Sequence, residues 1–550
     1  MSFFLLLAAC DGGGFLGSGD DGGIVEIRVE PETISMEARD GAAAETDFTA
    51  VAVFGDGSER EIDLVAWESS NQSAGTIDED GHFTSKDTNG GITTVTATHV
   101  GVAGSGEVTV VFVDSIVNGD LPGIDDAFRS AEASGGGPEI LYPEDGLRLP
   151  RNLEGLSFFW DRDSDDQVSR LRLRSAITDI SVYTAGESYT LNSTVWEQIS
   201  ASNREGEVEV SVSLGSWDGS QVSGVVEGPS QTLTVNRFDA RGSVVYWASA
   251  EGGILRIPFG ELEPEIFYRP EDDRCVGCHA ISNERDRMVV THGGINGMFE
   301  VVDISDPADP AIEVDTQPDE RSTFKSIHPD GTHMMASTLG ELSLYQLWDG
   351  AHVATYTSED YLTQPDFSPD GTEVVAVRAK DQNNPDEFRF ELGEIVKASF
   401  DLETAELGEW EVLVASDGSN NRYYPTFSPS GEWIAFNKAP GPAYAHRAAR
   451  LSLVKADGSI IIDLNKANGD GELQNSWPRW GPLPDDDILW LAYSSRREYP
   501  GKGASQQPQI WITGIDERLA EQGVDPSSAP FWLPGQDVDS DNHIPVWWEK

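Results

Sequence analysis

The chain has 550 residues, which is long enough for three or four domains that each bury a core of their own. It carries 95 acidic against 37 basic residues, a formal net charge of −58. A surface of this charge repels nucleic acid and anionic membranes, so the composition excludes a nucleic-acid-binding protein and fits an exported, charge-solubilised one. The 56 glycines, 29 prolines and 15 tryptophans, with little helix-period patterning, predict an all-β chain of many short strands.

The first element is the N-terminal run MSFFLLLAAC, which ends in Leu7-Ala8-Ala9-Cys10. This run resembles a bacterial lipobox, and the resemblance implies that Cys10 becomes the lipidated first residue of the mature protein. The glycine-rich residues up to position 23 would then form a flexible tether. The run is short and lacks a preceding Lys or Arg, so an accidental apolar N-terminus is the alternative. No later segment has the apolar length of a membrane span, so we expect an exported protein anchored to the cell envelope by lipid alone.

Residues 24–113 alternate apolar and polar positions between Gly/Asp turns, the pattern of half-buried strands in a β-sandwich. An opening V-x-P is followed by a G-D-G-S turn at Gly55, a W-E-S-S segment with Trp67, a D-x-x-G-x-F-T segment and a closing T-A-T strand. In this order the pieces resemble a group 2 bacterial Ig-like (BIG2) domain. The resemblance implies a spacer or an adhesive stalk.

Residues 114–137 contain SAEASGGG and few strand signals, so we predict a linker there. From about residue 138 to 236 the runs LSFFW, RLRLR, ISVYT, VEVSVSL and QTLTV predict a second sandwich. Its opening, PEILYPEDGLRLP, resembles the entry of Ig-like or fibronectin-III modules.

Residues 240–550 carry an internal repeat of an aromatic or aliphatic residue, a Pro/Asp/Ser-Gly turn and an apolar strand. Copies begin at Ser326 (SIHPDGTHMMAS), Asp366 (DFSPDGTEVVAV) and Thr426 (TFSPSGEWIAFN), with a degenerate copy at Pro478. Repeats tens of residues apart are typical of propeller blades. The F-S-P-D-G form resembles the PD40 repeats of TolB-like and WD40-like propellers. We predict a β-propeller of five or six blades, and prefer six.

Two of the three cysteines lie in the segment DDRCVGCHAIS, as Cys275 and Cys278, with His279 directly after the second. The spacing C-x-x-C-H is the attachment signature of c-type haem: two thiols bond to the porphyrin and the histidine binds its iron as proximal ligand. A Cys275–Cys278 disulfide or redox pair is the main alternative. A structural zinc site would need further Cys or His ligands at characteristic spacings, and the only other cysteine is Cys10.

The repeat alignment also predicts where this motif lies in the propeller. His279 falls on the proline position of P-x-F-S-P copies such as the one that begins at Pro425, so the motif leads into the innermost strand of a blade. Innermost strands line the axial channel, so we expect one covalent haem at a mouth of that channel. Equivalent segments should frame it: Lys325, Gln364-Pro365, Tyr423-Tyr424-Pro425 and Ser476-Trp477-Pro478.

A distal iron ligand is the next question, because ligation separates electron transfer from open-site chemistry. His543 ranks first, since the C-terminal segment FWLPGQDVDSDNHIPVWW is expected to close the last blade and return to the channel. Met298 and His292 follow, with His292 expected on the wrong side of the ring. Met288 is expected to pack inside its blade.

Two acidic stretches, residues 161–166 and 537–541, have the alternating carboxylates of calcium loops. Neither has the glycine and glutamate that an EF-hand needs, so solvated loops are the default and calcium is the lesser expectation. No G-x-S-x-G elbow is present, and nothing indicates a hydrolase.

These observations give a first hypothesis and two rivals. The first is a lipid-anchored c-type cytochrome-like protein that passes single electrons to a redox or docking partner of the envelope, and is not an enzyme. The second is a haem-free TolB-like binding scaffold with a Cys275–Cys278 disulfide. The third is an open-site haem enzyme with peroxidase activity.

Overall fold

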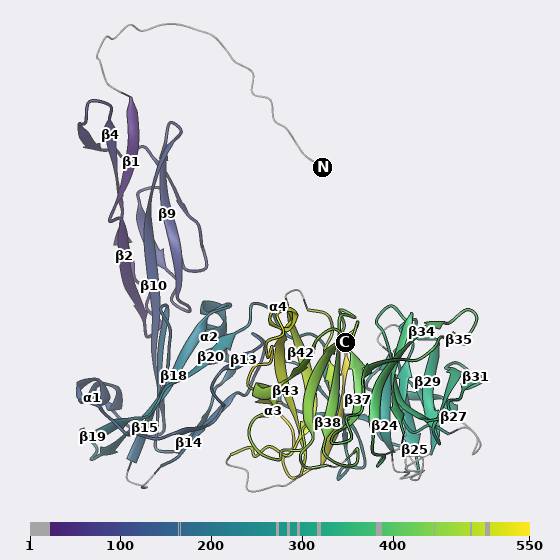
Figure 1. The fold of residues 1–550 in the computed structure, drawn as a ribbon. Helices are drawn as coiled ribbons and strands as arrows, with labels where there is room; N and C mark the ends of the chain where they lie inside the picture. Colours follow the sequence, from purple (N-terminus) through teal and green to yellow (C-terminus); the bar gives the residue numbers. More distant parts are fainter. Residues whose placement is uncertain are drawn as a thin grey trace, which may run out of the picture. The chain divides into compact units, whose positions relative to one another are not determined.

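A computed structural model describes residues 23–162, 164, 167–270, 274, 276–282, 286–293, 297–315, 321–380, 388–444, 446–484, 487–500 and 507–550. Strands dominate these residues and only four short helices occur among them, so the all-β prediction is confirmed (Figure 1). The chain divides into two compact units, residues 1–114 and 115–550. Cys10 and the predicted tether lie outside the described residues. None of the helices in the described ranges is long and apolar enough to cross a membrane.

The first unit is built from small sheets around one core, which includes the buried side chains of Ile27, Phe48, Phe83 and Val108. Trp67 packs against this core, its ring 6.5 Å from that of Phe48. One sheet has the order β1-β4-β5 and another β3-β8-β7, while β2 and β9 flank β10 and β6 extends the sheet beyond β9. The strands are β1 (Ile24–Glu30), β2 (Thr33–Arg39), β3 (Glu45–Asp47), β4 (Thr49–Phe54), β5 (Glu59–Glu61), β6 (Ala66–Ser69), β7 (Gly75–Ile77), β8 (His82–Ser85), β9 (Gly91–His99) and β10 (Val102–Asn118).

The segment predicted as a linker, residues 114–137, contains regular elements, and a few of its residues contribute to the core of the second unit. It contains the end of β10, the helix α1 (Ile124–Ser130) and the short strand β11 (Ser134–Gly135). Ile124 and Phe128 of α1 are buried against Tyr183. The sequence suggested a linker because the apolar residues of this segment span less than two helical turns between Gly and Ser residues. Such a stretch is too short to show helical periodicity.

The second sandwich follows, with a central antiparallel run β16-β15-β18-β19 and a smaller sheet β12-β14-β17. It is fastened to the propeller: the Trp532 backbone N–H donates to the Tyr142 hydroxyl over 3.1 Å, and Arg497 forms an ion pair with Glu144. Its elements are β12 (Ile140–Tyr142), β13 (Leu147–Leu149), β14 (Ser157–Trp160), β15 (Gln167–Arg174), β16 (Thr178–Thr184), β17 (Ser188–Thr190), α2 (Ser193–Ser202), β18 (Glu207–Trp217), β19 (Val222–Glu227) and β20 (Gln231–Val235).

Six antiparallel sheets fill the rest of the described chain. In chain order they are β21 (Ser243–Ala248), β22 (Gly253–Pro258) and β23 (Glu265–Tyr268); β24 (Val276–Ser282), β25 (Arg287–His292), β26 (Met298–Asp303) and β27 (Ala311–Asp315); β28 (Lys325–Ile327), β29 (His333–Thr338), β30 (Glu341–Gln346) and β31 (His352–Tyr356); β32 (Tyr361–Phe367), β33 (Glu373–Ala379), β34 (Gly393–Asp401), β35 (Glu406–Leu407) and β36 (Glu411–Val414); β37 (Asn421–Phe427), β38 (Trp433–Ala439), β39 (Arg450–Lys455) and β40 (Ile461–Asp463); and β41 (Ser476–Trp480), β42 (Ile488–Ser495), β43 (Gln509–Asp516) and β44 (Phe531–Trp532). Two short helices, α3 (Asn465–Asn468) and α4 (Glu517–Glu521), lie in the connections.

The first of these sheets is completed by the C-terminal strand β45 (Asn542–Trp548), which pairs antiparallel with β21. The innermost strands β24, β28, β32, β37, β41 and β45 contact one another in that order, and β45 contacts β24 in turn. This closed ring of innermost strands is the defining feature of a β-propeller. As the sequence predicts, the C-terminal segment closes the ring.

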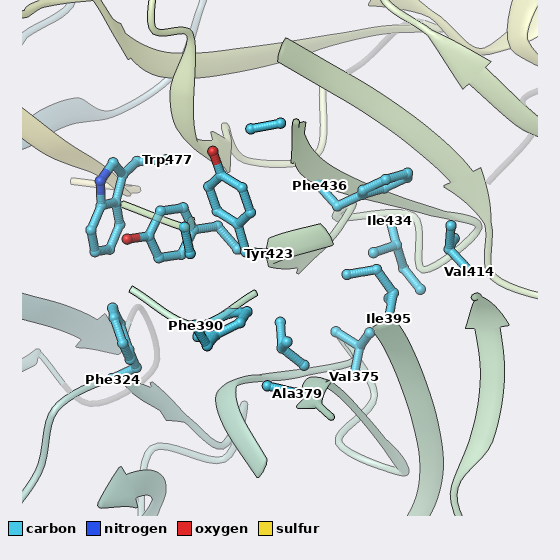
Figure 2. Close-up of a cluster of buried hydrophobic side chains, with 14 of the residues drawn as sticks. Phe324, Val375, Ala379, Phe390, Ile395, Val414, Tyr423, Ile434, Phe436 and Trp477 are labelled. Carbon is cyan, nitrogen blue, oxygen red and sulfur yellow. The ribbon is translucent and has the colours of Figure 1, made fainter. Parts of the chain in front are cut away.

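The blades pack through apolar side chains between neighbouring sheets. One cluster joins Val375 and Ile395 of one blade to Ile434 and Phe436 of the next. Figure 2 shows these four side chains at one edge of the cluster and Trp477 and Phe324 at the opposite edge. The cluster therefore runs from between two blades to the residues around the axis.

Candidate functional site

A β-bulge lies at an equivalent position on the innermost strands β24, β32, β37 and β41. Their pairing shifts between Gly277 and Ala280 on β24, and at matching positions on β32, β37 and β41. The first bulge residue has a positive φ on three of these strands: 54° at Gln364, 51° at Tyr424 and 59° at Trp477. A proline follows each of those three, and on β24 the corresponding residue is His279. His279 thus lies in a proline position, as the repeat alignment predicts.

The first bulge residues of β24, β32, β37 and β41 lie close to Ile544 of β45 and to Phe324, which directly precedes β28, and we call these six residues the axial ring. They line one cavity, in which the centre of a water molecule can reach about 20 Å³, together with His279, Lys325 and Arg479. That space holds about one or two waters, so the ring nearly closes the channel. The axial ring consists of Cys278, Phe324, Gln364, Tyr424, Trp477 and Ile544.

Aromatic packing holds the axial ring in place. Tyr424 and Trp477 stack with their ring centroids 3.9 Å apart, and Phe324 lies 5.7 Å from each. The Tyr424 backbone N–H donates to Oε1 of Gln364 over 2.6 Å. Offset stacks and tilted pairs of this kind add stability beyond the area that they bury. The axial ring is therefore a rigid partition between the two mouths of the channel.

On one side of the partition lies a cavity with mostly apolar walls, which we call the apolar cavity. The volume of this cavity that the centre of a water molecule can occupy is about 230 Å³. Cys278 lies on its wall, and Arg389 at its rim is exposed. The lining residues are Trp247, Val276, Gly277, Cys278, Thr291, Thr323, Phe388, Arg389, Tyr444, Trp477, His543 and Ile544.

His543 also lines the apolar cavity, from the closing strand β45. Its Nε2 lies 3.0 Å from Oδ1 of Asp541, and its ring centroid lies 6.3 Å from that of Trp247. The side chain is 15% exposed. Cys278 and His543, which are 265 positions apart in the chain, are therefore neighbours in one cavity.

His279 is on the other side of Cys278. Its side chain is 5% exposed, and it lines the axial-ring cavity and the opposite mouth of the channel, not the apolar cavity. Neither of its ring nitrogens makes a well-formed hydrogen bond. Burial, and after it the charge of Lys325, lowers the pKa of His279 to about 3. Cys278 and His279, which the motif predicts to bind one haem, therefore line different spaces in the structure.

Lys325 occupies the corresponding proline position on β28 and ties that strand to β24. Its Nζ donates to the Cys278 carbonyl over 2.6 Å and to the Thr291 hydroxyl over 2.5 Å. Burial lowers the pKa of Lys325 to about 8. Lys325 was expected only as one of the residues that frame the site. A lysine where other copies have proline is the sequence signal that it has a role of its own.

The remaining candidates for an iron ligand lie outside the apolar cavity. Nε2 of His292 is 2.6 Å from Oε2 of Glu300, and both side chains are fully buried. Glu300 also accepts a hydrogen bond from the Tyr268 hydroxyl at 2.6 Å and pairs with Arg274 at 2.7 Å. Met298 lies opposite His292 on the neighbouring strand. His292 is therefore paired with the buried carboxylate of Glu300. Both residues lie in the blade that contains the C-V-G-C-H segment.

The pKa of Glu300 reflects this cluster. Burial by itself raises the pKa, but hydrogen bonds from His292 and Tyr268 and the charge of Arg274 outweigh burial and bring it below its usual value. Glu300 is therefore ionised at neutral pH. Met288, on the strand between β24 and β26, is fully buried in the blade as predicted.

The opposite mouth is wider and polar, and we call it the polar funnel. Water centres can reach about 380 Å³ of it. Asp366 and Arg479 lie in its wall, with Asp366 accepting from the Ser326 hydroxyl at 2.9 Å and from the Phe427 N–H at 2.9 Å. Burial raises the pKa of Asp366. The polar funnel and the apolar cavity share no lining residue.

No protein-family model and no curated protein matches this chain. Among solved structures it is similar to TolB from Acinetobacter baumannii, at 15% identity and a TM-score of 0.39, over 62% of this chain and 80% of that one. A putative TolB from Agrobacterium tumefaciens gives 16% identity and a TM-score of 0.33, over 56% and 97%. The β-propeller domain of Cps50 (Swd1) from Myceliophteria thermophila gives 12% and 0.32, over 52% and 90%. Likeness at this level says nothing of what the chain binds.

Parts of the predicted site lie outside the described residues: Cys275, and positions 163, 165 and 166 of the first acidic stretch. Among the residues that are described, no three His, Cys, Asp or Glu side chains converge as a metal-binding group. A haem would depend on other features. The apolar cavity offers aromatic walls, the Cys278 side chain, an imidazole at His543 and a rim cation at Arg389 that can pair with propionates. These features fit a haem, whereas the position of His279 does not fit its expected role as ligand.

Proposed function

We propose that the protein is an exported envelope propeller that holds one covalently attached haem c in the apolar cavity and exchanges single electrons with a partner. The observation that carries this proposal is the position of Cys278: the second cysteine of C-V-G-C-H lies on the wall of a cavity with aromatic sides at a channel mouth. When bound, haem supplies a one-electron iron couple.

The chain's own residues then have separate tasks. Cys275 and Cys278 hold the porphyrin through thioether bonds. Trp247 and Phe388 keep water from one face, and Arg389 at the rim can pair with the propionates. A porphyrin edge that remains at the mouth is within reach of a docked partner. Because the chain carries a net charge of −58, a partner with a basic surface would be steered toward it.

The location is part of the proposal. The resemblance to c-type cytochromes implies that haem is attached outside the cytoplasm. The lipobox-like segment that ends at Cys10 would supply the membrane anchor. The first unit and the second sandwich would then act as spacers between the membrane and the propeller.

Covalent haem can be tested directly. Expressed in a host with haem-maturation machinery, the full chain is expected to show a Soret band and a haem-staining band on a denaturing gel. Cys278→Ala should abolish the staining band, because one of the two thioether sites is lost and maturation fails. Cys10→Ala, which leaves the C-x-x-C-H motif intact, is the matched control and should change membrane attachment but not haem content per folded protein. A purified unmodified protein with neither a Soret band nor a haem-staining band would contradict the proposal.

A second candidate is a haem-free docking scaffold, and the polar funnel favours it. Its wall carries the charged groups of Asp366 and Arg479 at the end of a channel, a surface suited to a polar partner segment. This candidate expects a Cys275–Cys278 disulfide. Thiol titration and intact mass separate the two: a disulfide removes two hydrogens, whereas haem adds the mass of one porphyrin.

A further inference from the structure

The apolar cavity contains one imidazole among the described residues that line it, and this is not the imidazole next to the cysteines. His543 lines the cavity together with Cys278, whereas His279 lines the spaces beyond the axial ring. An iron ion at the centre of a porphyrin held by Cys278 in this cavity would therefore meet His543 and not His279.

The backbone of β24 explains the separation. Cys278 and His279 are the two residues of the bulge in β24, and they line different spaces: Cys278 the apolar cavity and His279 the polar funnel. Pairing with β25 fixes the strand on both sides of the bulge, through Val276 with His292 and Ala280 with Val289. Turning His279 into the apolar cavity would break this pairing and displace Lys325, whose Nζ donates to the Cys278 carbonyl.

His543 has the surroundings of a metal-binding histidine. Nε2 of its ring is 3.0 Å from a carboxylate oxygen of Asp541, which leaves Nδ1 to bind a metal. Histidines that bind metals usually donate their other ring N–H to a carboxylate or carbonyl, which fixes the ring and makes it a stronger donor. Trp247, in register opposite His543 on β21, limits rotation of the ring from one side.

We propose that iron in the apolar cavity takes its protein imidazole from His543, oriented by Asp541, while His279 remains a structural residue in the proline position of β24. This inference rests on the proposed function, since it concerns the same haem. It also goes beyond it: if His543 supplied the protein imidazole, the iron would still be able to bind an added small ligand such as carbon monoxide or imidazole.

The deciding variants leave the C-V-G-C-H motif unchanged, so that haem attachment is not affected. In His543→Ala the ferrous protein should lose the iron–imidazole stretching band in resonance Raman spectra, and millimolar imidazole should restore that band. Asp541→Asn should keep the band but move it to lower frequency, because the ring loses its carboxylate partner. His328→Ala, a buried histidine of the polar funnel, is the matched control and should leave the spectrum unchanged.

The outcomes distinguish the two proposals. Covalent haem whose iron–imidazole band survives in His543→Ala overturns this inference and leaves the proposed function standing. An unmodified protein without covalent haem overturns the proposed function, and this inference with it. Loss of the band in His543→Ala together with an unchanged His328→Ala spectrum supports both.

Discussion

Replacing Trp548 by alanine is expected to lower the free energy of unfolding of the second unit by about 3–5 kcal/mol, the usual cost of removing a buried tryptophan. Trp548 is 1% exposed at the end of the closing strand β45. Its ring lies 5.2 Å from that of Phe267, and the guanidinium of Arg256 lies 5.3 Å from its centroid. The loss should appear as a lower midpoint in urea denaturation followed by circular dichroism.

The matched control for this prediction is Trp348→Ala. Trp348 is 53% exposed on another blade, so its removal should change the free energy of unfolding by no more than about 0.5 kcal/mol. Equal losses in the two variants would show that β45 does not contribute to the ring as described.

The second large effect is expected from Glu300→Gln. The glutamine cannot pair with Arg274 and makes weaker hydrogen bonds to His292 and Tyr268, so we expect a loss of about 2–3 kcal/mol at neutral pH. The folded pKa of Glu300 is below its usual value, so its contribution is present above pH ~4.5 and is lost as pH falls. The difference between the unmodified protein and the variant should therefore shrink below about pH 4.

Glu313→Gln is the control for Glu300→Gln. Glu313 on β27 pairs with Arg287 on β25 across the intervening strand β26 of the same blade, but its side chain is 28% exposed. Partly exposed pairs contribute less than about 1 kcal/mol, so this variant should show a small loss that salt reduces. A loss as large as that of Glu300→Gln would mean that burial is not what makes the Glu300 cluster important.

Much of the fold could be predicted because the propeller is built from local sequence repeats. The F-S-P-D-G turn after Asp366 and the F-S-P-S-G turn after Thr426 lead into the second strands of their blades. The proline position of these repeats located His279 on an innermost strand. The position of β45 also followed from the need to close a ring. Local spacing was enough for these features, since each blade is one supersecondary unit.

Other features depend on residues far apart in the chain and could not be predicted in this way. Cys278, Tyr444 and His543 are neighbours because the innermost strands β24 and β45 and the connection between β38 and β39 bring them to one mouth. The side on which His279 lies depends on the bulge in β24, and a five-residue motif does not show whether its backbone is a helical loop or a strand. The docking of α1 on Tyr183 is equally non-local.

The closing strand also bears on how the protein is made. The Ser243 hydroxyl donates to the Lys550 carbonyl across 307 positions, so the first blade lacks its innermost strand until β45 has been synthesised. Contacts of such sequence separation form slowly, so we expect closure of the ring to be a late step of folding. In the exported protein that we propose, this dependence would keep the propeller open until β45 has followed the rest of the chain.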